Sequence, residues 1–157
     1  MKKLYLKFIY YFLKIFAIKL IKTHNPIIIA ITGSVGKTST KEAIYQVLYD
    51  EFGPNVRKNH GNLNAEIGLP LTIMGYKKVP NKFIWPIFLF FAYIKTFTQK
   101  YPKYLVLEMG IEKKGDMKYL TSIVQPNFVV ITSTTPAHIG NFESIRHYQE
   151  EKISLLK

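Results

Sequence analysis

The sequence predicts an α/β fold of the P-loop, Rossmann-like class, in which a mostly parallel sheet is flanked by helices. Short apolar runs alternate along the chain with stretches of helical periodicity, and this alternation is typical of parallel α/β sheets. A glycine-rich stretch with a Lys-Thr pair, residues 31–40 (ITGSVGKTST), lies between the first apolar run and the first helical stretch. The 157 residues have the length of one domain and include no cysteine, which excludes disulfides and thiolate metal sites.

The strands are predicted from apolar runs without polar alternation, because strands that are covered on both faces have this pattern. In chain order the predicted strands are 27–31, 55–58, 104–109 and 128–132. The predicted helices are 37–50, a short one that follows the 61–70 loop and ends at residue 74, 115–124 and 143–156. Strands and helices therefore alternate through most of the chain.

The net charge of +12 lies in two hydrophobic segments. Residues 1–22 and 73–104 each hold six lysines and no acidic residue, whereas the remainder holds ten basic and ten acidic residues. Surfaces that bind nucleic acid usually combine basic residues with polar residues and glycine, so no nucleic-acid partner is predicted. Lysines among Phe, Ile, Leu and Tyr are typical of helices at an anionic membrane surface. The alternative is that both segments pack on other parts of a larger protein.

Neither segment is predicted to cross a membrane. Lys7, Lys14 and Lys19 interrupt the first segment, and no signal-peptide cleavage site follows it. The longest charge-free run of the second segment, 83–94, is shorter than the ~20 residues that span a bilayer. We expect residues 1–24 to form a basic amphipathic helix that, with 76–103, holds a cytoplasmic protein on the inner face of the plasma membrane.

Residues 25–157 are predicted to form a nucleotide-binding domain around the loop at 33–38. Gly33 and Gly36 allow a tight turn that directs backbone N–H groups at phosphate oxygens, and the following helix adds its dipole. Lys37 is expected to reach the β- and γ-phosphates of ATP, and the hydroxyl of Thr38 to bind Mg²⁺. The residues predicted to bind nucleotide are Gly33, Ser34, Val35, Gly36, Lys37, Thr38 and Ser39.

The loop departs from the general phosphate-binding motif, because Ile31 occupies the place of the first glycine. The alternative is a glycine-rich turn with an incidental Lys-Thr pair.

Glu108 ends a buried apolar strand, where an unpaired carboxylate is costly. Its position and its oxygen chemistry predict a Mg²⁺ ligand, and the alternative is an ion pair with a structural lysine.

The compact loop and three later stretches together resemble the Mur ligases and their relatives, the folylpolyglutamate and cyanophycin synthetases. The later stretches are 61–74 (GNLNAEIGLPLTIM), 105–120 (LVLEMGIEKKGDMKYL) and 129–152 (VVITSTTPAHIGNFESIRHYQEEK). The resemblance covers 27–157 apart from about 76–103, which we expect to be an insertion. The first stretch resembles the branch that adds D-Ala-D-Ala to a UDP-muramoyl tripeptide, although Ala65, Ser133 and Gly140 depart from that pattern.

The resemblance implies an ATP-dependent amide ligase of peptidoglycan synthesis, which forms an acyl phosphate that an amine attacks. It implies Lys37, His138 and Lys152 as catalytic residues. It implies a substrate loop with Asn62 and Asn64, and it implies Mg²⁺ ligands at Thr38, Glu108, His138 and Lys152. Lys152 matches the carbamylated lysine of the family; from the residues alone it is a solvated lysine, and His138 is a hydrogen-bonded loop residue.

The resemblance also implies UDP-muramoyl peptide and D-Ala-D-Ala as substrates of the complete enzyme. The UDP-binding and amine-binding domains of the family have no counterpart in this sequence, so we expect a partial central domain that supplies the ATP and Mg²⁺ site. Two alternatives are a membrane-associated P-loop ATPase and a non-catalytic nucleotide-binding module. The Glu-ended strand and the spacing from His138 to Lys152 favour the ligase.

Overall fold

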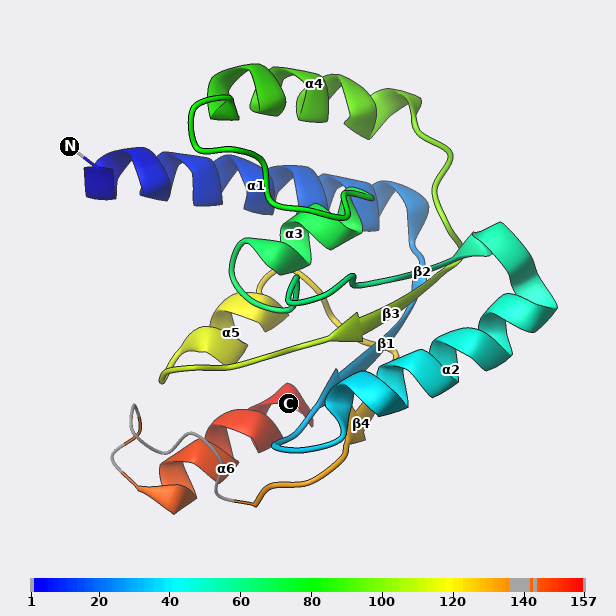
Figure 1. Ribbon diagram of the computed structural model, residues 1–157, viewed down its shortest axis with the longest axis vertical. Coiled ribbons are helices and arrows are strands. Elements are labelled where there is room, and N and C mark those ends of the chain that lie inside the picture. Colours follow the sequence, from blue (N-terminus) through cyan, green and yellow to red (C-terminus); the bar gives the residue numbers. More distant parts are fainter. Residues whose placement is uncertain (1, 136–141, 143, 157) are drawn as a thin grey trace.

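A four-stranded parallel sheet forms the centre of the computed structural model, which describes residues 2–135, 142 and 144–156. The strands are β1 (Ile27–Thr32), β2 (Val56–Lys58), β3 (Tyr104–Glu108) and β4 (Phe128–Ile131). Their order across the sheet is β2-β3-β1-β4, and every neighbouring pair is parallel (Figure 1). The predicted α/β class is therefore confirmed, and the central strands are β1 and β3.

Alternate residues of the central strands face two separate hydrophobic clusters, as the pleat of a strand requires. Ile29 and Ile31 of β1 lie in a cluster with Val106, against which α2 (Lys37–Phe52) packs. Ile28 and Ala30 lie in the larger cluster on the other face of the sheet. Because both faces are covered, the central strands lack polar alternation.

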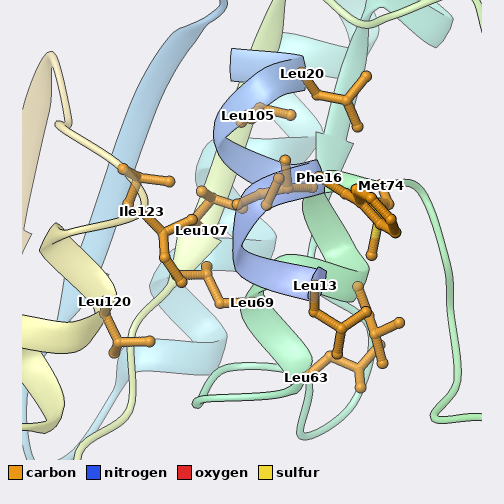
Figure 2. Packing of buried hydrophobic residues seen from close by; sticks show 14 of the residues in the cluster. Leu13, Phe16, Leu20, Leu63, Leu69, Met74, Leu105, Leu107, Leu120 and Ile123 are labelled. Atoms are coloured by element: carbon orange, nitrogen blue, oxygen red, sulfur yellow. The ribbon is translucent and has the colours of Figure 1, made fainter. Parts of the chain in front are cut away.

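The larger cluster is covered by α1 (Lys2–His24), α3 (Gly68–Ile73) and α5 (Asp116–Thr121). Figure 2 shows Leu13, Phe16 and Leu20 of α1 among side chains of α3 and β3. The predicted helix at 1–24 is thus present, but one side of it is part of the core of this domain. The expected contact of this helix with a membrane surface stays a prediction.

Helix α4 (Trp85–Thr98) packs beside α1 as an outer layer, farther from the sheet (Figure 1). It occupies the middle of the segment 76–103. In the described part of the chain, no helix has the combination of length and hydropathy that crossing a membrane requires. Helix α6 (Ile145–Ile153) and a final 3₁₀ turn (Ser154–Leu156) lie near the C-terminal ends of β1 and β4.

Most predicted boundaries agree with the structure to within a few residues. The predicted strand at 55–58 begins at Val56, because Gly53–Asn55 forms a 3₁₀ turn around Pro54. The predicted helix at 115–124 ends at Thr121, ahead of Pro126, and the predicted helix at 143–156 begins at Ile145. Ser144 caps that helix, because its side chain accepts a hydrogen bond from the backbone N–H of His147.

Candidate functional site

A glycine-rich loop connects β1 to α2 at the C-terminal edge of the sheet. Gly33 has φ 145°, and a Cβ atom there would lie 2.1 Å from Oγ1 of Thr132. Gly36 has φ 85° and precedes the first turn of α2. Both positions need glycine, one for space and one for its backbone conformation. The loop therefore brings backbone N–H groups and the N-terminus of a 16-residue helix to one place, where an anion is favoured.

Lys37 is the first residue of α2, and its side chain folds back over the loop. Its Nζ donates hydrogen bonds to the carbonyl oxygens of Gly33, at 2.8 Å, and Ser34, at 3.2 Å. The ammonium group is thereby held against the loop. The predicted contact of Lys37 with the β- and γ-phosphates of ATP stays a prediction.

Lys152 of α6 also reaches this loop. Its Nζ donates to the carbonyl oxygen of Gly33 at 2.8 Å, and the residue is 2% exposed. Burial, together with the nearby charge of Lys37, lowers the pKa of Lys152 to about 8. The interpretation of Lys152 as a solvated helix residue is therefore wrong. The structure brings it together with the phosphate loop, to which no periodicity in the sequence connects it.

Glu108, the last residue of β3, is 3% exposed and lies beside the start of α2. Its Oε2 accepts a hydrogen bond from Oγ1 of Thr38 at 3.0 Å, and Nζ of the buried Lys41 lies 3.7 Å from the same oxygen. Hydroxyl and carboxylate oxygens are ligands that Mg²⁺ prefers. The oxygens of Thr38 and Glu108 thus fit a Mg²⁺ site next to the 33–38 loop, and Lys41 offsets the buried charge.

Two asparagines fix the carboxylate and the backbone of Glu108. Asn64 donates from Nδ2 to Oε1 of Glu108 at 2.9 Å. Asn59, which is 1% exposed, accepts from the backbone N–H of Glu108 at 2.6 Å and donates to its carbonyl oxygen at 3.1 Å. Asn59 also donates to the carbonyl oxygen of Leu63 at 2.7 Å, which ties the Asn64 loop to β3.

A cavity of about 290 Å³ lies between the phosphate loop, the Asn64 loop and α6. Its lining residues are Ser34, Lys37, Asn64, Ala65, Gly110, Ile111, Glu112, Tyr148 and Lys152. The hydroxyl of Tyr148 lies 2.9 Å from that of Ser34, so α6 closes one side of the cavity against the loop. The cavity therefore contains the two lysines that donate to the Gly33 carbonyl.

The predicted site residues are only partly brought together. Lys37, Thr38, Glu108, Asn64 and Lys152 surround one region, whereas the exposed Asn62 lines a different cavity with Glu66 and Asp116. Val35 and Ser39 are exposed on the loop and the first turn of α2. His138 lies outside the described residues, so its predicted role stays a prediction. Among the residues that the structure describes, no three His, Asp or Glu side chains form a metal-binding group.

Three residues of the site were missed in the sequence. Lys41 lies one helical turn after Lys37, and this spacing is the signal that places it on the same face of α2. Tyr148 precedes Lys152 by one turn on α6 in the same way. Asn59 has no such signal, because its role depends on the pairing of β2 with β3.

Comparison with known families and proteins identifies close counterparts of this region. The Mur ligase middle domain matches residues 31–85 and 89–157. The UDP-N-acetylmuramoyl-tripeptide–D-alanyl-D-alanine ligase of Borreliella burgdorferi is 33% identical over 128 residues, which are 82% of this chain and 22% of the relative. The Bacillus subtilis ligase of the same name is 31% identical over 129 residues, or 82% of this chain and 23% of that protein.

Solved structures agree with these sequence matches. MurF ligase from Thermotoga maritima in complex with ADP superimposes with a TM-score of 0.71 at 29% identity, over 92% of this chain and 28% of that one. MurF from Acinetobacter baumannii gives a TM-score of 0.69 at 26% identity, over 91% of this chain and 26% of that one. The chain spans about a quarter or less of the length of its sequence relatives.

Proposed function

The chain belongs to the Mur ligase family, and we propose that it supplies the ATP- and Mg²⁺-binding part of an amide ligase that adds D-Ala-D-Ala to a UDP-muramoyl tripeptide. The ligase would use ATP to activate a carboxylate as an acyl phosphate, which the amine of the dipeptide then attacks. The observation that carries this proposal is the contact of Thr38 with Glu108 at 3.0 Å, directly beside the Lys37 loop.

Different groups at the loop would stabilise different negative charges during phosphoryl transfer. The backbone N–H groups at 33–38 and the N-terminus of α2 bind phosphate oxygens, and Lys37 neutralises charge on the β- and γ-phosphates. Thr38 and Glu108 would hold Mg²⁺, which neutralises negative charge on the same phosphates. Asn64 and Lys41 keep the Glu108 carboxylate oriented toward Thr38.

Lys152 is proposed to act as a carbamate. A neutral lysine amine can take up CO₂, which forms an N–C bond, releases a proton and leaves a carboxylate in place of an ammonium. Burial beside Lys37 lowers the pKa of Lys152 to about 8, which increases its neutral fraction near neutral pH. The carbamate would supply an oxygen ligand to a second metal, and His138 would be a further ligand.

Two relatives named as D-Ala-D-Ala ligases support the choice of substrates, and the 61–70 loop that carries Asn64 supports the same branch.

Because the reaction consumes ATP, we propose that the protein acts in the cytoplasm. The matches cover only 22% and 23% of the length of these two relatives. We therefore expect the 157 residues alone to bind ATP–Mg²⁺ without making the amide bond, because acyl phosphate and amine must be held together.

Release of ADP from ATP–Mg²⁺ tests the ligase proposal against the ATPase alternative. A ligase site transfers phosphate to a carboxylate, so the chain alone should bind ATP and release almost no ADP. Continuous hydrolysis of ATP in the absence of any muramoyl peptide would contradict the proposal and favour a P-loop ATPase. Formation of the amide from UDP-muramoyl tripeptide and D-Ala-D-Ala by these residues alone would contradict the partial role.

A further inference from the structure

Helix α1 carries apolar side chains on two opposite sides. One side, with Leu13 and Leu20, is buried in the core. The other side carries Leu4, Phe8, Tyr11 and Ile15. These residues are three or four positions apart, so they form one stripe along the helix. These four side chains are between 39% and 75% exposed. The outward stripe is therefore not explained by packing within this domain.

Helix α4 has the same two-sided character. Trp85, Leu89 and Ala92 face the core, and the opposite side is apolar as well. The outward side chains are Ile87, Phe90, Phe91, Ile94 and Phe97, all between 41% and 63% exposed. A helix that is apolar on every side is normally covered on every side. We call these five residues, with the four of the α1 stripe, the outer α1–α4 surface.

The two helices contribute to one continuous layer. The rings of Phe16 and Tyr93 lie 5.8 Å apart, and Nζ of Lys19 lies 3.3 Å from the ring centre of Phe97. At the start of both helices, a cavity of about 680 Å³ is lined by residues of α1 and by residues next to and within α4, including Leu6 and Phe83. The two helices therefore lie side by side from their first turns to the contact between Lys19 and Phe97.

The charges around this layer have one sign. No acidic residue occurs in 1–41 or in 67–107, which include both helices and their flanking loops. Lys77, Lys78 and Lys82 precede α4 and are exposed, and Lys100 and Lys103 follow it and are exposed. A band of exposed aromatic and aliphatic side chains therefore has ammonium groups at both ends.

We propose that the outer α1–α4 surface lies in the interface of a bilayer that contains anionic phospholipids. Apolar side chains of such a layer enter the boundary between headgroups and acyl chains, while lysines pair with anionic headgroups. The single sign of charge and the absence of acidic residues in both segments favour this occupant over an ordinary protein surface. The proposal goes beyond the ligase function and does not depend on it.

The position of this surface leaves the nucleotide site accessible. Helix α4 lies at the top of Figure 1, whereas α6 and the C-terminal end of β1 lie at the bottom. A bilayer against α4 would therefore face the side of the molecule opposite to the phosphate loop. ATP binding and lipid binding are expected to be independent of each other.

Sedimentation of the full 157-residue chain with vesicles tests the proposal. One set of vesicles contains phosphatidylcholine alone, and the other contains equal parts of phosphatidylcholine and phosphatidylglycerol. Binding to the anionic vesicles should be at least about tenfold tighter, and it should weaken with added NaCl because salt screens exposed charges. Deletion of 1–22 is not a usable variant, because α1 supplies part of the core.

The apolar contribution is tested by the triple variant Ile87→Ser, Phe91→Ser and Ile94→Ser, which changes only exposed side chains of α4. Its affinity for the anionic vesicles should fall at least about tenfold, because less apolar area enters the interface. The matched control is Val47→Ser on α2, which is 72% exposed on the other face of the sheet and should leave binding unchanged. Unchanged thermal unfolding and ATP binding would show that both variants are folded.

Three results would overturn the proposal. The first is failure of the wild-type chain to sediment with anionic vesicles at low salt. The second is equal affinity of the wild-type chain for both kinds of vesicle. The third is equal affinity of the triple variant and the wild type for the anionic vesicles. If light scattering shows a dimer that the triple variant converts to a monomer, and no vesicle binding occurs, then the outer α1–α4 surface is a contact between two copies instead.

Discussion

Lys37 and Lys152 donate hydrogen bonds from Nζ to the same acceptor, the carbonyl oxygen of Gly33, and both distances are 2.8 Å. One ammonium group comes from the start of α2 and the other from α6, so the loop is held by two cations that repel each other. Bound phosphate or a carbamate on Lys152 would relieve this repulsion. The geometry therefore links nucleotide binding to the chemical state of Lys152.

The titration of Lys152 should appear in the stability of the protein. Its pKa is about 8 in the folded chain and 10.5 as the ordinary value, so between these values the unfolded chain binds more protons. The stability of wild type relative to Lys152→Met should therefore be constant below about pH 8 and rise with pH above it. Urea unfolding at a series of pH values measures this, and a difference that is independent of pH would contradict the lowered pKa.

Lys152 should take up CO₂, because its pKa is lowered and its amine is held at the loop. In ¹³C NMR with ¹³C-bicarbonate, the wild-type chain should show a protein-bound carbamate signal. The variant Lys152→Met should lack that signal, while Lys114→Met, which alters an exposed lysine, should retain it. If the Lys152→Met variant keeps the signal, the carbamate is on another amine of the protein.

Glu108 is predicted to bind the metal ion as well as to pair with Lys41. Glu108→Gln should lower the affinity for Mn²⁺ in the presence of ATP, and it should cost about 1–3 kcal/mol of stability because buried Lys41 loses a counter-ion. The double variant Lys41→Met, Glu108→Gln should regain much of that stability but not the Mn²⁺ affinity. Water-proton relaxation by Mn²⁺ measures the metal affinity. Equal affinity in wild type and Glu108→Gln would mean that Glu108 pairs with Lys41 and does not bind the metal.

Asn59 and Asn62 provide a matched pair within one loop. Asn59→Ala should destabilise the fold by about 2–4 kcal/mol, because it removes hydrogen bonds to both backbone groups of Glu108 and to Leu63. Asn62→Ala changes an exposed side chain and should cost less than about 0.5 kcal/mol. Urea unfolding compares the two, and similar free energies of unfolding would mean that Asn59 does not hold the loop on β3.

Local patterns in the sequence predicted the strands and the phosphate loop because their causes are local. The apolar run at 27–31 predicted a strand buried on both faces, and Gly33 and Gly36 predicted a turn that only glycine accommodates. The apolar run at 104–108 likewise predicted that Glu108 ends a buried strand, whereas its contact with Thr38 requires β3 to pair with β1.

The periodicity of the sequence could not predict which distant segments would contact each other. Lys41 pairs with Glu108 and Asn59 with β3 only because β2, β3 and β1 lie in that order across the sheet. The same reason applies to Lys152, whose helical surroundings in the sequence resemble a solvated face although α6 packs its side chain against the loop. In α1, the sequence pattern showed a wide apolar face but not which side of it the core would cover.

Calorimetric titration of ATP–Mg²⁺ into the wild-type chain and into Lys37→Ala tests the central claim most directly. Lys37 is held above the loop by Gly33 and Ser34, so its removal should raise the Kd for ATP about 10- to 100-fold. The matched control Lys114→Ala removes an exposed lysine and should leave the Kd unchanged. If wild type and Lys37→Ala bind ATP–Mg²⁺ with the same Kd, the loop at 33–38 is not a phosphate-binding site.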